Sequence, residues 1–255
     1  MTASTKGNRY SLQTVFWGLG EEGQQRLAES SVLVAGLGAL GGTLAQLMVR
    51  AGVGRVRVVD HDRVSLDNLH RQLLYDEGDA EQAALKAETG GRSLKAMNRL
   101  VKIDAVTAEL SADNILNLMA DVDLVLDGLD NFPVRVQINT AAVKLQKPWI
   151  YAGVLGSGGN VMVIRPGRTP CLRCIFPDVS PDDSLPGTET AGILGPVSAF
   201  AASFSANEAL KYLSGSPDKC LTGMMRFDLW QNDFEVISFE KNSKDCICSP
   251  SLEAV

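Results

Sequence analysis

The glycine-rich segment near the N-terminus is the first stretch whose spacing could do chemistry. It follows the pattern G-x-G-x-x-G, with glycines at Gly36, Gly38 and Gly41. In such a pattern the first glycine permits a tight turn, the second lets a phosphate approach the backbone, and the third lets a helix pack closely on a strand. The N-terminus of the next helix then attracts the anion. The segment predicts a nucleotide-binding loop, with a purely steric glycine turn as the alternative.

A carboxylate and two cations follow this loop at positions that suit a nucleotide. Asp60 closes an apolar run 19 residues after Gly41, where a carboxylate accepts the hydroxyls of a ribose. Arg71 and Lys86 come next. A triphosphate carries more charge than a dinucleotide pyrophosphate, so it needs such cations, and usually a metal, when pyrophosphate leaves. The pattern favours ATP over NAD, although Arg71 and Lys86 could also be ordinary surface charges.

A second acidic segment is expected at the same edge of the fold. It reads D-G-L-D-N and follows the apolar residues 122–127. Ligands of open α/β sheets bind beyond the carboxyl ends of the strands, and carboxylates there suit Mg²⁺. Asp130 is therefore a candidate magnesium ligand. Asp130 or Asn131 could also cap the following helix, and the two roles are compatible.

Four of the five cysteines form two close pairs. Cys171 and Cys174 make a C-x-x-C pattern, and Cys246 and Cys248 make C-x-C. Four thiolates from two tight turns match a closed tetrahedral zinc site, which would fix the C-terminal tail to the body of the protein. Free thiols or a redox pair are the alternatives. Cys220 is expected to be a packed or exposed thiol outside the site.

The elements that must position these residues alternate along the chain, as in a sheet covered by helices on both faces. The expected strands cover residues 31–36, 55–60, 101–106, 122–127, 148–153 and 160–165. The expected helices cover residues 39–50, 79–100, 112–119, 134–145 and 196–213, and a hairpin is expected at 221–228 and 234–239. We therefore expect an α/β fold with a Rossmann-like, doubly wound, mostly parallel sheet, a C-terminal antiparallel extension and a zinc-bound tail.

The domain division follows from the texture of the sequence. Residues 1–29 are expected to form an N-terminal helical arm, because Leu12, Val15 and Phe16 recur at helical spacing. Residues 30–255 are expected to form a single nucleotide-binding domain. Its polar loop, at about 178–195, is expected to close over a substrate tail, because long loops in compact domains are often functional. A flexible linker is the alternative. Met224, Met225, Trp230 and Phe234 are expected to pack in the core or in the hairpin, with a groove for a partner as the alternative.

Composition excludes several classes of function. The formal net charge of −6 argues against binding to nucleic acid or to an anionic membrane. No apolar run reaches the roughly 18 residues of a membrane span, and the polar N-terminus lacks the apolar stretch of a secretory signal. We therefore expect a cytoplasmic protein with reduced thiols.

Taken together, these motifs resemble the ubiquitin-activating-enzyme-like adenylyltransferases, which include the MoeB, ThiF and HesA proteins. The resemblance covers about residues 9–249 and is most specific in D-x-D-x-V-x-x-x-N-L-x-R-Q, which begins at Asp60. It implies that a carboxylate attacks the α-phosphate of Mg-ATP to give an acyl-adenylate and pyrophosphate. The implied substrate is the C-terminal Gly-Gly of a small ubiquitin-like sulfur carrier. The resemblance also implies a homodimer with structural zinc.

The resemblance assigns roles to residues of this sequence. The implied catalytic residues are Arg71, Lys86 and Asp130, the last through Mg²⁺. The implied nucleotide-binding residues are Gly36, Gly38, Gly41, Asp60, Asp62, Asn68, Arg71, Gln72, Lys86 and Asn131. Asn131 and Arg135 are further implied to support the turn that carries Asp130.

Three positions depart from the family pattern. The arm of the family often reads R-Y-x-R-Q, and its second arginine reaches the ATP of the partner subunit, but Leu12 stands there in this chain. The usual G-Q-x-K reads A-A-L-K at residues 83–86, and Thr188 stands where some members have a cysteine that joins the carrier. Adenylation of a small-molecule or peptide carboxylate therefore stays open, as do an NAD-dependent oxidoreductase and a non-catalytic binding module.

Overall fold

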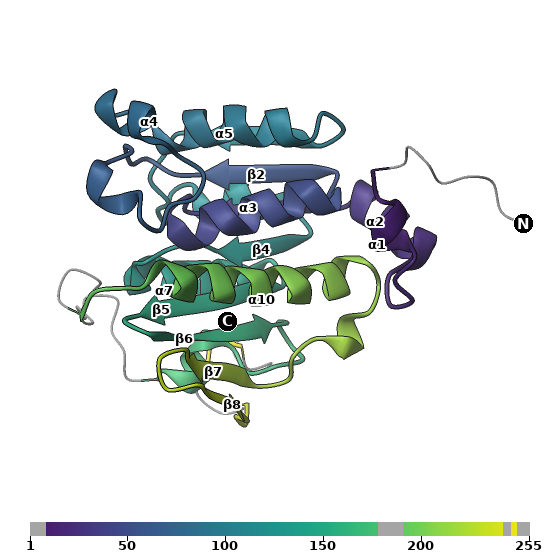
Figure 1. Ribbon diagram of the computed structural model, residues 1–255. Coiled ribbons are helices and arrows are strands. Elements are labelled where there is room, and N and C mark those ends of the chain that lie inside the picture. Colours follow the sequence, from purple (N-terminus) through teal and green to yellow (C-terminus); the bar gives the residue numbers. More distant parts are fainter. Residues whose placement is uncertain (1–8, 178–190, 242–245, 249–255) are drawn as a thin grey trace, which may run out of the picture.

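One sheet forms the centre of the computed structural model, which describes residues 9–177, 191–241 and 246–248 (Figure 1). Its strands are β1 (Ser31–Ala35), β2 (Arg55–Val59), β3 (Lys102–Val106), β4 (Leu124–Asp127), β5 (Trp149–Leu155), β6 (Gly158–Ile164), β7 (Met224–Asp228) and β8 (Asp233–Ile237). Their order is β3-β2-β1-β4-β5-β6-β7-β8. The first five run parallel and the last three are antiparallel. The predicted mostly parallel sheet with an antiparallel extension is confirmed.

Helices cover both faces of this sheet. On one face lie α3 (Ala39–Ala51), α5 (Lys86–Met97) and α10 (Gly195–Leu213), and on the other lie α6 (Ile115–Ala120), α7 (Phe132–Lys144) and α8 (Leu172–Ile175). Successive side chains of a strand point to opposite faces. Accordingly, Val32 and Val34 of β1 join one hydrophobic core, whereas Leu33 and Ala35 join the other. The fold is therefore doubly wound.

The carboxyl ends of the parallel strands meet at one edge of the sheet. Both α3 and α10 begin at this edge and run side by side across the same face (Figure 1). Between β2 and α5 the chain forms the short helices η1 (Leu66–Asn68) and α4 (Glu77–Glu81). This edge therefore receives the N-termini of α3 and α10 together with the loops in which the sequence predicts functional residues.

The predicted helix at 79–100 is interrupted, and the interruption serves the site. Ala83 has a positive φ of 44°, and residues 84–85 turn back toward residues 63–64, where Val64 N–H donates to the carbonyl of Ala84 at 2.8 Å. The Lys86 N–H then donates to the Asp62 carbonyl at 2.9 Å. This turn places Lys86 at the first residue of α5.

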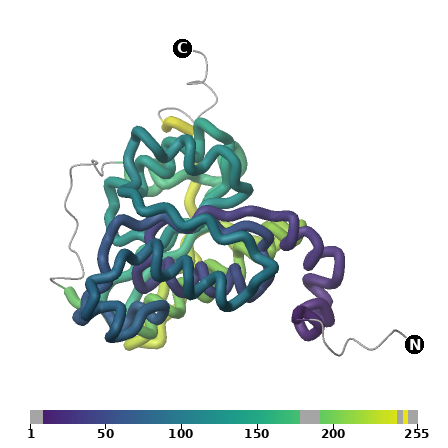
Figure 2. The backbone as a smooth tube through the Cα atoms, turned by 90° about the horizontal axis from the view of Figure 1, so that it is seen from above, coloured from purple at the N-terminus to yellow at the C-terminus, as the bar shows by residue number. Residues whose placement is uncertain are grey.

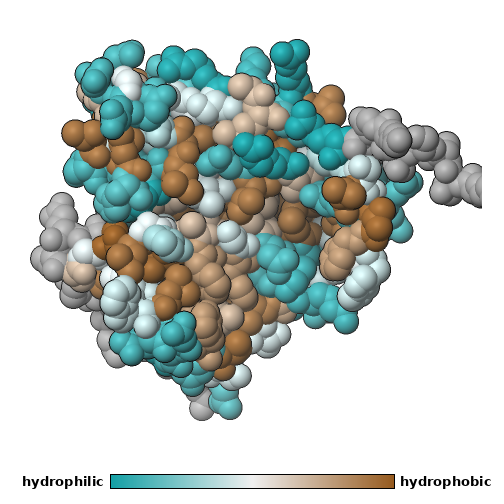
Figure 3. Space-filling model, in the orientation of Figure 1, coloured by the Kyte–Doolittle hydropathy of each residue, from teal (hydrophilic) through white to brown (hydrophobic). Residues whose placement is uncertain are grey.

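The N-terminal arm consists of two helices, α1 (Ser11–Thr14) and α2 (Gly20–Glu29), rather than one. It lies at the opposite edge of the molecule and projects from the body (Figure 2). There the Gln13 side chain donates to the carbonyl of Ala51, the last residue of α3, at 2.9 Å. Leu12 and Trp17 are 89% and 88% exposed. The space-filling view shows apolar side chains on this arm (Figure 3).

The remaining connections are only partly described. Residues 178–190 of the polar loop, including Thr188, lie outside the described residues. Beyond them, Leu194 N–H donates to the Gly156 carbonyl at 3.1 Å, so the approach to α10 runs beside the β5–β6 turn. A 3-10 turn, η2 (Pro217–Lys219), follows α10. None of the helices in the described ranges has the length and apolar character that a bilayer crossing requires.

Candidate active site and metal centre

A cavity of about 970 Å³ opens at the carboxyl edge of the sheet. Its walls include nine of the residues that the sequence assigned to nucleotide or magnesium: Gly36, Gly38, Asp60, Asp62, Arg71, Gln72, Lys86, Asp130 and Asn131. Gly41 and Asn68 are not part of the wall. The volume lies in the range of sites for small molecules and cofactors. The fold thus brings residues from separate loops around one space.

The glycine loop joins β1 to α3 with the geometry that its spacing predicts. Gly36 has a φ of +83°, which favours glycine, and its N–H donates to the Val59 carbonyl at 2.9 Å. A Cβ on Gly41 would lie 2.0 Å from the Gly36 carbonyl oxygen, so a side chain cannot be placed there without moving the loop. Gly41 therefore acts by allowing close packing, which explains its absence from the cavity wall.

Asp60 is held by the backbone of two loops. One of its carboxylate oxygens accepts the Leu37 N–H at 2.6 Å, and the other accepts the Asp62 N–H at 2.8 Å. These bonds fix the carboxylate beside the glycine loop. Because each carboxylate oxygen has two lone pairs, both can accept a further hydrogen bond from a ribose hydroxyl.

Arg71 is positioned by Asn68. The Asn68 carbonyl oxygen accepts from the Arg71 guanidinium, while the Asn68 amide donates to the Ser65 hydroxyl. Asn68 therefore orients the cation without lining the cavity itself. The neighbouring Gln72 is only 4% exposed, and its amide nitrogen lies 3.7 Å from the position that a Cβ on Gly38 would occupy.

Lys86 is almost buried and is tied to the same loops. Its ammonium forms an ion pair with the Asp62 carboxylate at 3.0 Å. The Tyr75 hydroxyl lies 2.9 Å from the Leu37 carbonyl and 3.2 Å from the Lys86 carbonyl, and it shares its one proton between them, which links the glycine loop to the start of α5. Burial raises the pKa of Tyr75, so the hydroxyl keeps the proton that it donates.

The sequence left two roles open at this turn, magnesium ligand and helix cap, and the structure favours a different residue for each. The Asn131 side chain caps α7 by accepting the Val134 N–H at 3.3 Å. Asp130 is exposed at the cavity, and no hydrogen bond from another described residue engages its carboxylate. A carboxylate with unused oxygens suits Mg²⁺, which binds through one or two carboxylates and the substrate phosphates.

A buried ion pair beneath this turn was only partly anticipated. Asp127 is fully buried and accepts from the Arg135 Nε at 2.8 Å and from the Leu129 N–H at 2.9 Å. Arg135 also donates to the carbonyls of Leu129 and Ala152. Burial raises the pKa of Asp127, and the charge of Arg135 opposes the rise. The pair therefore holds the turn between β4 and α7 against β5.

Sequence patterns alone assigned no role to Asp127, and Arg135 entered only through the resemblance. The available signal was an aspartate that ends the apolar run V-D-L-V-L-D, followed by an arginine eight residues later. Ser198 of α10, which also lines the cavity, gave no signal at all.

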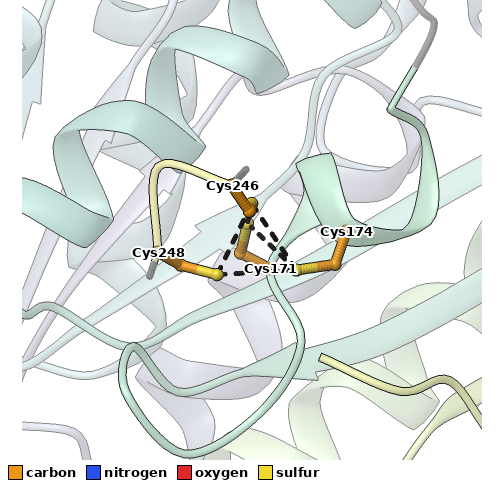
Figure 4. A group of neighbouring side chains, drawn as sticks. All are labelled: Cys171, Cys174, Cys246 and Cys248. Carbon is orange, nitrogen blue, oxygen red and sulfur yellow. Dashed lines mark hydrogen bonds between the residues drawn. The ribbon is translucent and has the colours of Figure 1, made fainter. Parts of the chain in front are cut away.

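The four predicted zinc ligands converge, as Figure 4 shows, and they belong to the hydrophobic core on the face of the sheet that α6, α7 and α8 cover. Their sulfur atoms lie within 4.8 Å of one another, and the hydrogen-bonded pairs are separated by 3.4 to 3.9 Å. A tetrahedral zinc with Zn–S bonds of about 2.3 Å places its sulfurs roughly 3.8 Å apart. The donor set therefore fits zinc. Cys220 is buried elsewhere, against the Glu208 carbonyl.

The surroundings of these thiols also suit a metal. The Asn139 amide lies 3.6 Å from the Cys171 sulfur, and its oxygen accepts the Leu172 N–H at 2.9 Å. Burial raises the pKa of Cys246 to about 11, so a cation that binds this sulfur must displace its proton. Zinc would supply a fixed link between residues 246–248 and α8.

Zinc removal is expected to destabilise the protein. Wild-type protein is expected to contain about one zinc per chain, and Cys248→Ser is expected to lose the metal together with about 3 kcal/mol of unfolding free energy. Metal analysis and denaturant unfolding measure both. The matched control is Cys220→Ser, which removes a buried thiol outside the cluster and should keep the metal. Wild-type protein that is purified without zinc, or whose unfolding free energy does not fall when the zinc is removed by a chelator, would contradict the assignment.

These features define a Rossmann-type nucleotide-binding protein with a four-cysteine centre. The chain belongs to the ThiF family, whose model matches residues 10–248. The family that the sequence motifs resemble is thereby confirmed.

Two relatives illustrate the similarity. The sulfur carrier protein ThiS adenylyltransferase of Bacillus subtilis is 38% identical over 229 residues, which cover 88% of this chain and 66% of the relative. The sulfur carrier protein adenylyltransferase of Thermus thermophilus is 37% identical over 246 residues, which cover 94% of this chain and 90% of the relative. This chain thus spans slightly less than two thirds of the length of the Bacillus protein.

The fold is also similar to solved structures. The crystal structure of E. coli MccB superposes with a TM-score of 0.84 at 20% identity, over 97% of this chain and 74% of that one. This likeness supports the predicted fold class.

Proposed function

We propose that this protein is an ATP-dependent adenylyltransferase that activates the C-terminal carboxylate of a small ubiquitin-like sulfur carrier ending in Gly-Gly. The observation that carries the proposal is the single cavity that collects the glycine loop, Asp60, Arg71, Lys86 and Asp130. The names of the two relatives support a sulfur carrier as the partner.

The described contacts suit each part of ATP. The fixed Asp60 carboxylate would accept the ribose hydroxyls, and the N-terminus of α3 beyond Gly38 would face the phosphates. Arg71 and Lys86 would neutralise the charge that develops on the leaving pyrophosphate. Mg²⁺ held at Asp130 would supply additional charge neutralisation and a template for the reacting groups.

The reaction needs positioning more than acid–base catalysis. An oxygen of the ionised carboxylate would attack the α-phosphorus, and a new C–O–P linkage would form while the bond to the β-phosphate oxygen breaks. Because the carboxylate is already deprotonated, no general base is required. Placing the two reactants in line and stabilising the departing anion supplies the catalytic effect.

The arm supports a homodimer as the working form. Its described part, residues 9–29, packs at the C-terminal end of α3, and a 13-residue helix is roughly 20 Å long, so these residues lie far from the cavity of their own chain. The exposed apolar side chains of Leu12 and Trp17 would be covered in a dimer. We place the protein in the cytoplasm, where its cysteines would stay reduced and able to bind zinc.

The direct test is pyrophosphate exchange with a panel of acids. Wild-type protein with Mg-ATP is expected to exchange labelled pyrophosphate into ATP only when a Gly-Gly-ended carrier is added. A carrier shortened by its last two residues is the control, since it keeps the folded body but loses the reacting carboxylate. Sedimentation of the same sample is expected to show a dimer of the 27.3 kDa chain.

Each other outcome points to a different function. Exchange with a small acid or a peptide, but with no carrier, would favour adenylation of that class instead. Binding of NAD without ATP would favour an oxidoreductase. Binding of ATP without any exchange would leave a non-catalytic module, and a monomer with full activity would contradict the dimer.

A further inference from the structure

The N-terminus of α10 opens at the same cavity but has no role in the assignments above. Its N-cap residue, Leu194, has no side chain that can cap the helix, and Pro196 lacks an N–H. The first helical residue, Gly195, packs against the segment that carries Arg71: a Cβ there would lie 2.8 Å from the His70 carbonyl oxygen and 3.6 Å from the Arg71 Cα. A 19-residue helix with an uncapped N-terminus therefore points its positive end toward Arg71.

The buried hydroxyl of Ser198, one turn further along α10, is a second observation that is independent of the uncapped helix N-terminus. Ser198 is 0% exposed and lines the cavity, and its hydroxyl has no hydrogen-bond partner among the described residues. Buried polar groups in folded proteins are almost always hydrogen-bonded, because an unpaired one loses its contacts with water. An unpaired hydroxyl on a cavity wall therefore indicates a partner that enters from the cavity.

The side-chain amide of Gln72 also contains a buried polar atom without a hydrogen-bond partner. Gln72 is 4% exposed and lines the cavity, and its carbonyl oxygen has no partner in the described ranges. Its nitrogen lies beside Gly38, at the N-terminus of α3, which is likewise uncapped by a side chain. Gln72 and Arg71 thus lie between the beginnings of two helices. Two positive helix ends and a guanidinium form a site for a multiply charged anion.

We propose that the N-terminal turn of α10 and the Ser198 hydroxyl bind the terminal phosphates of ATP, and then the pyrophosphate, together with Arg71. This inference rests on the proposed adenylation. It assigns to α10 a part in holding the leaving group. The Ser198 hydroxyl would donate to a phosphate oxygen, and the end of the helix would stabilise the charge that accumulates as the bond to the α-phosphorus breaks.

The geometry favours phosphate over the acyl group as the ligand. Gly195 packs directly on the residue that would neutralise the pyrophosphate. By contrast, the turn of Asp130, where the carboxylate would meet the α-phosphate, follows β4 and is held by Arg135 from the opposite face of the sheet. Inorganic pyrophosphate is therefore the appropriate probe.

The test compares two buried serines of the same helix. Ser205 is 1% exposed and also has an unpaired hydroxyl, but it does not line the cavity. Ser198→Ala is expected to weaken the binding of inorganic pyrophosphate and of ATP by roughly tenfold in calorimetry with Mg²⁺, because a hydrogen bond to a charged group is lost. The binding of AMP should not change. Ser205→Ala should match wild type for all three ligands.

A stability measurement separates binding from folding. Removing an unpaired buried hydroxyl does not cost a native hydrogen bond, so both alanine variants should keep or raise the melting temperature. If Ser198→Ala binds pyrophosphate as wild type does, or loses AMP equally, the inference is wrong. If it keeps pyrophosphate but raises the KM for the carrier, Ser198 serves the acyl group instead. Failure of wild type to bind ATP would overturn the proposed function itself.

Discussion

Replacing Arg71 by alanine is expected to lower the rate of pyrophosphate exchange by about two to three orders of magnitude, because one fixed donor to the developing charge is removed. Arg71 lines the cavity, is oriented by Asn68, and lies against the N-terminus of α10. Its guanidinium is thus held in place before the reaction begins. The measurement is carrier-dependent exchange at saturating ATP.

Arg50→Ala is the matched control for this variant. Arg50 lies in the last turn of α3, is exposed and does not line the cavity. It should therefore exchange as wild type does. Arg71→Lys keeps the charge but loses the planar fork, so its rate should fall between those of wild type and Arg71→Ala. Full exchange by Arg71→Ala would show that the site is assigned wrongly.

Short-range signals explain the parts of the fold that the sequence predicted well. The strand before Gly36 and the helix after it are correct to within one residue, because an apolar run, a glycine turn and an amphipathic helix follow one another directly. Asp60 was located by its spacing alone, and the structure places it beside the glycine loop. The cysteine pairs were equally local, and their convergence followed from the chemistry of zinc.

Long-range packing explains what could not be predicted. Helical spacing in the arm gave no indication that Leu12 and Trp17 face outward, since periodicity identifies an apolar face but not what covers it. The prediction that Trp230 packs in the hairpin is wrong, since Trp230 is 73% exposed, whereas the ring of Phe234 lies 5.8 Å from that of Phe200 and packs as predicted. The unpaired hydroxyl of Ser198 depends on how α10 meets the cavity, which a helical pattern does not specify.

Arg135→Met is expected to cost about 3 to 5 kcal/mol of unfolding free energy, because it leaves the Asp127 carboxylate buried without its cation. Asp127 is 0% exposed, and methionine supplies no donor to it. Arg226→Met is the matched control. Arg226 also pairs with two carboxylates, but its side chain is 44% exposed, so its loss should lower the unfolding free energy far less than the loss of Arg135 does. Denaturant unfolding measures both.

The pH dependence of this loss has a defined sign. Burial raises the folded-state pKa of Asp127, and removing Arg135 removes the charge that opposes the rise. A carboxyl whose folded pKa exceeds its unfolded value, about 4, stabilises the fold when protonated and loses that contribution as pH rises. The stability difference between wild type and Arg135→Met should therefore be smaller at pH 5 than at pH 8. A stability difference that is the same at both pH values would contradict the interpretation that Arg135→Met leaves a charged Asp127 carboxylate buried.

A double variant separates the stability of the pair from its role in positioning. Adding Asp127→Asn to Arg135→Met removes the uncompensated charge, so part of the lost stability should return. The contacts from Arg135 to the carbonyls of Leu129 and Ala152 do not return with it. If those contacts hold the Asp130 turn against β5, exchange stays low in a folded double variant. If the double variant recovers both its unfolding free energy and its exchange activity, the Asp127–Arg135 pair serves stability alone.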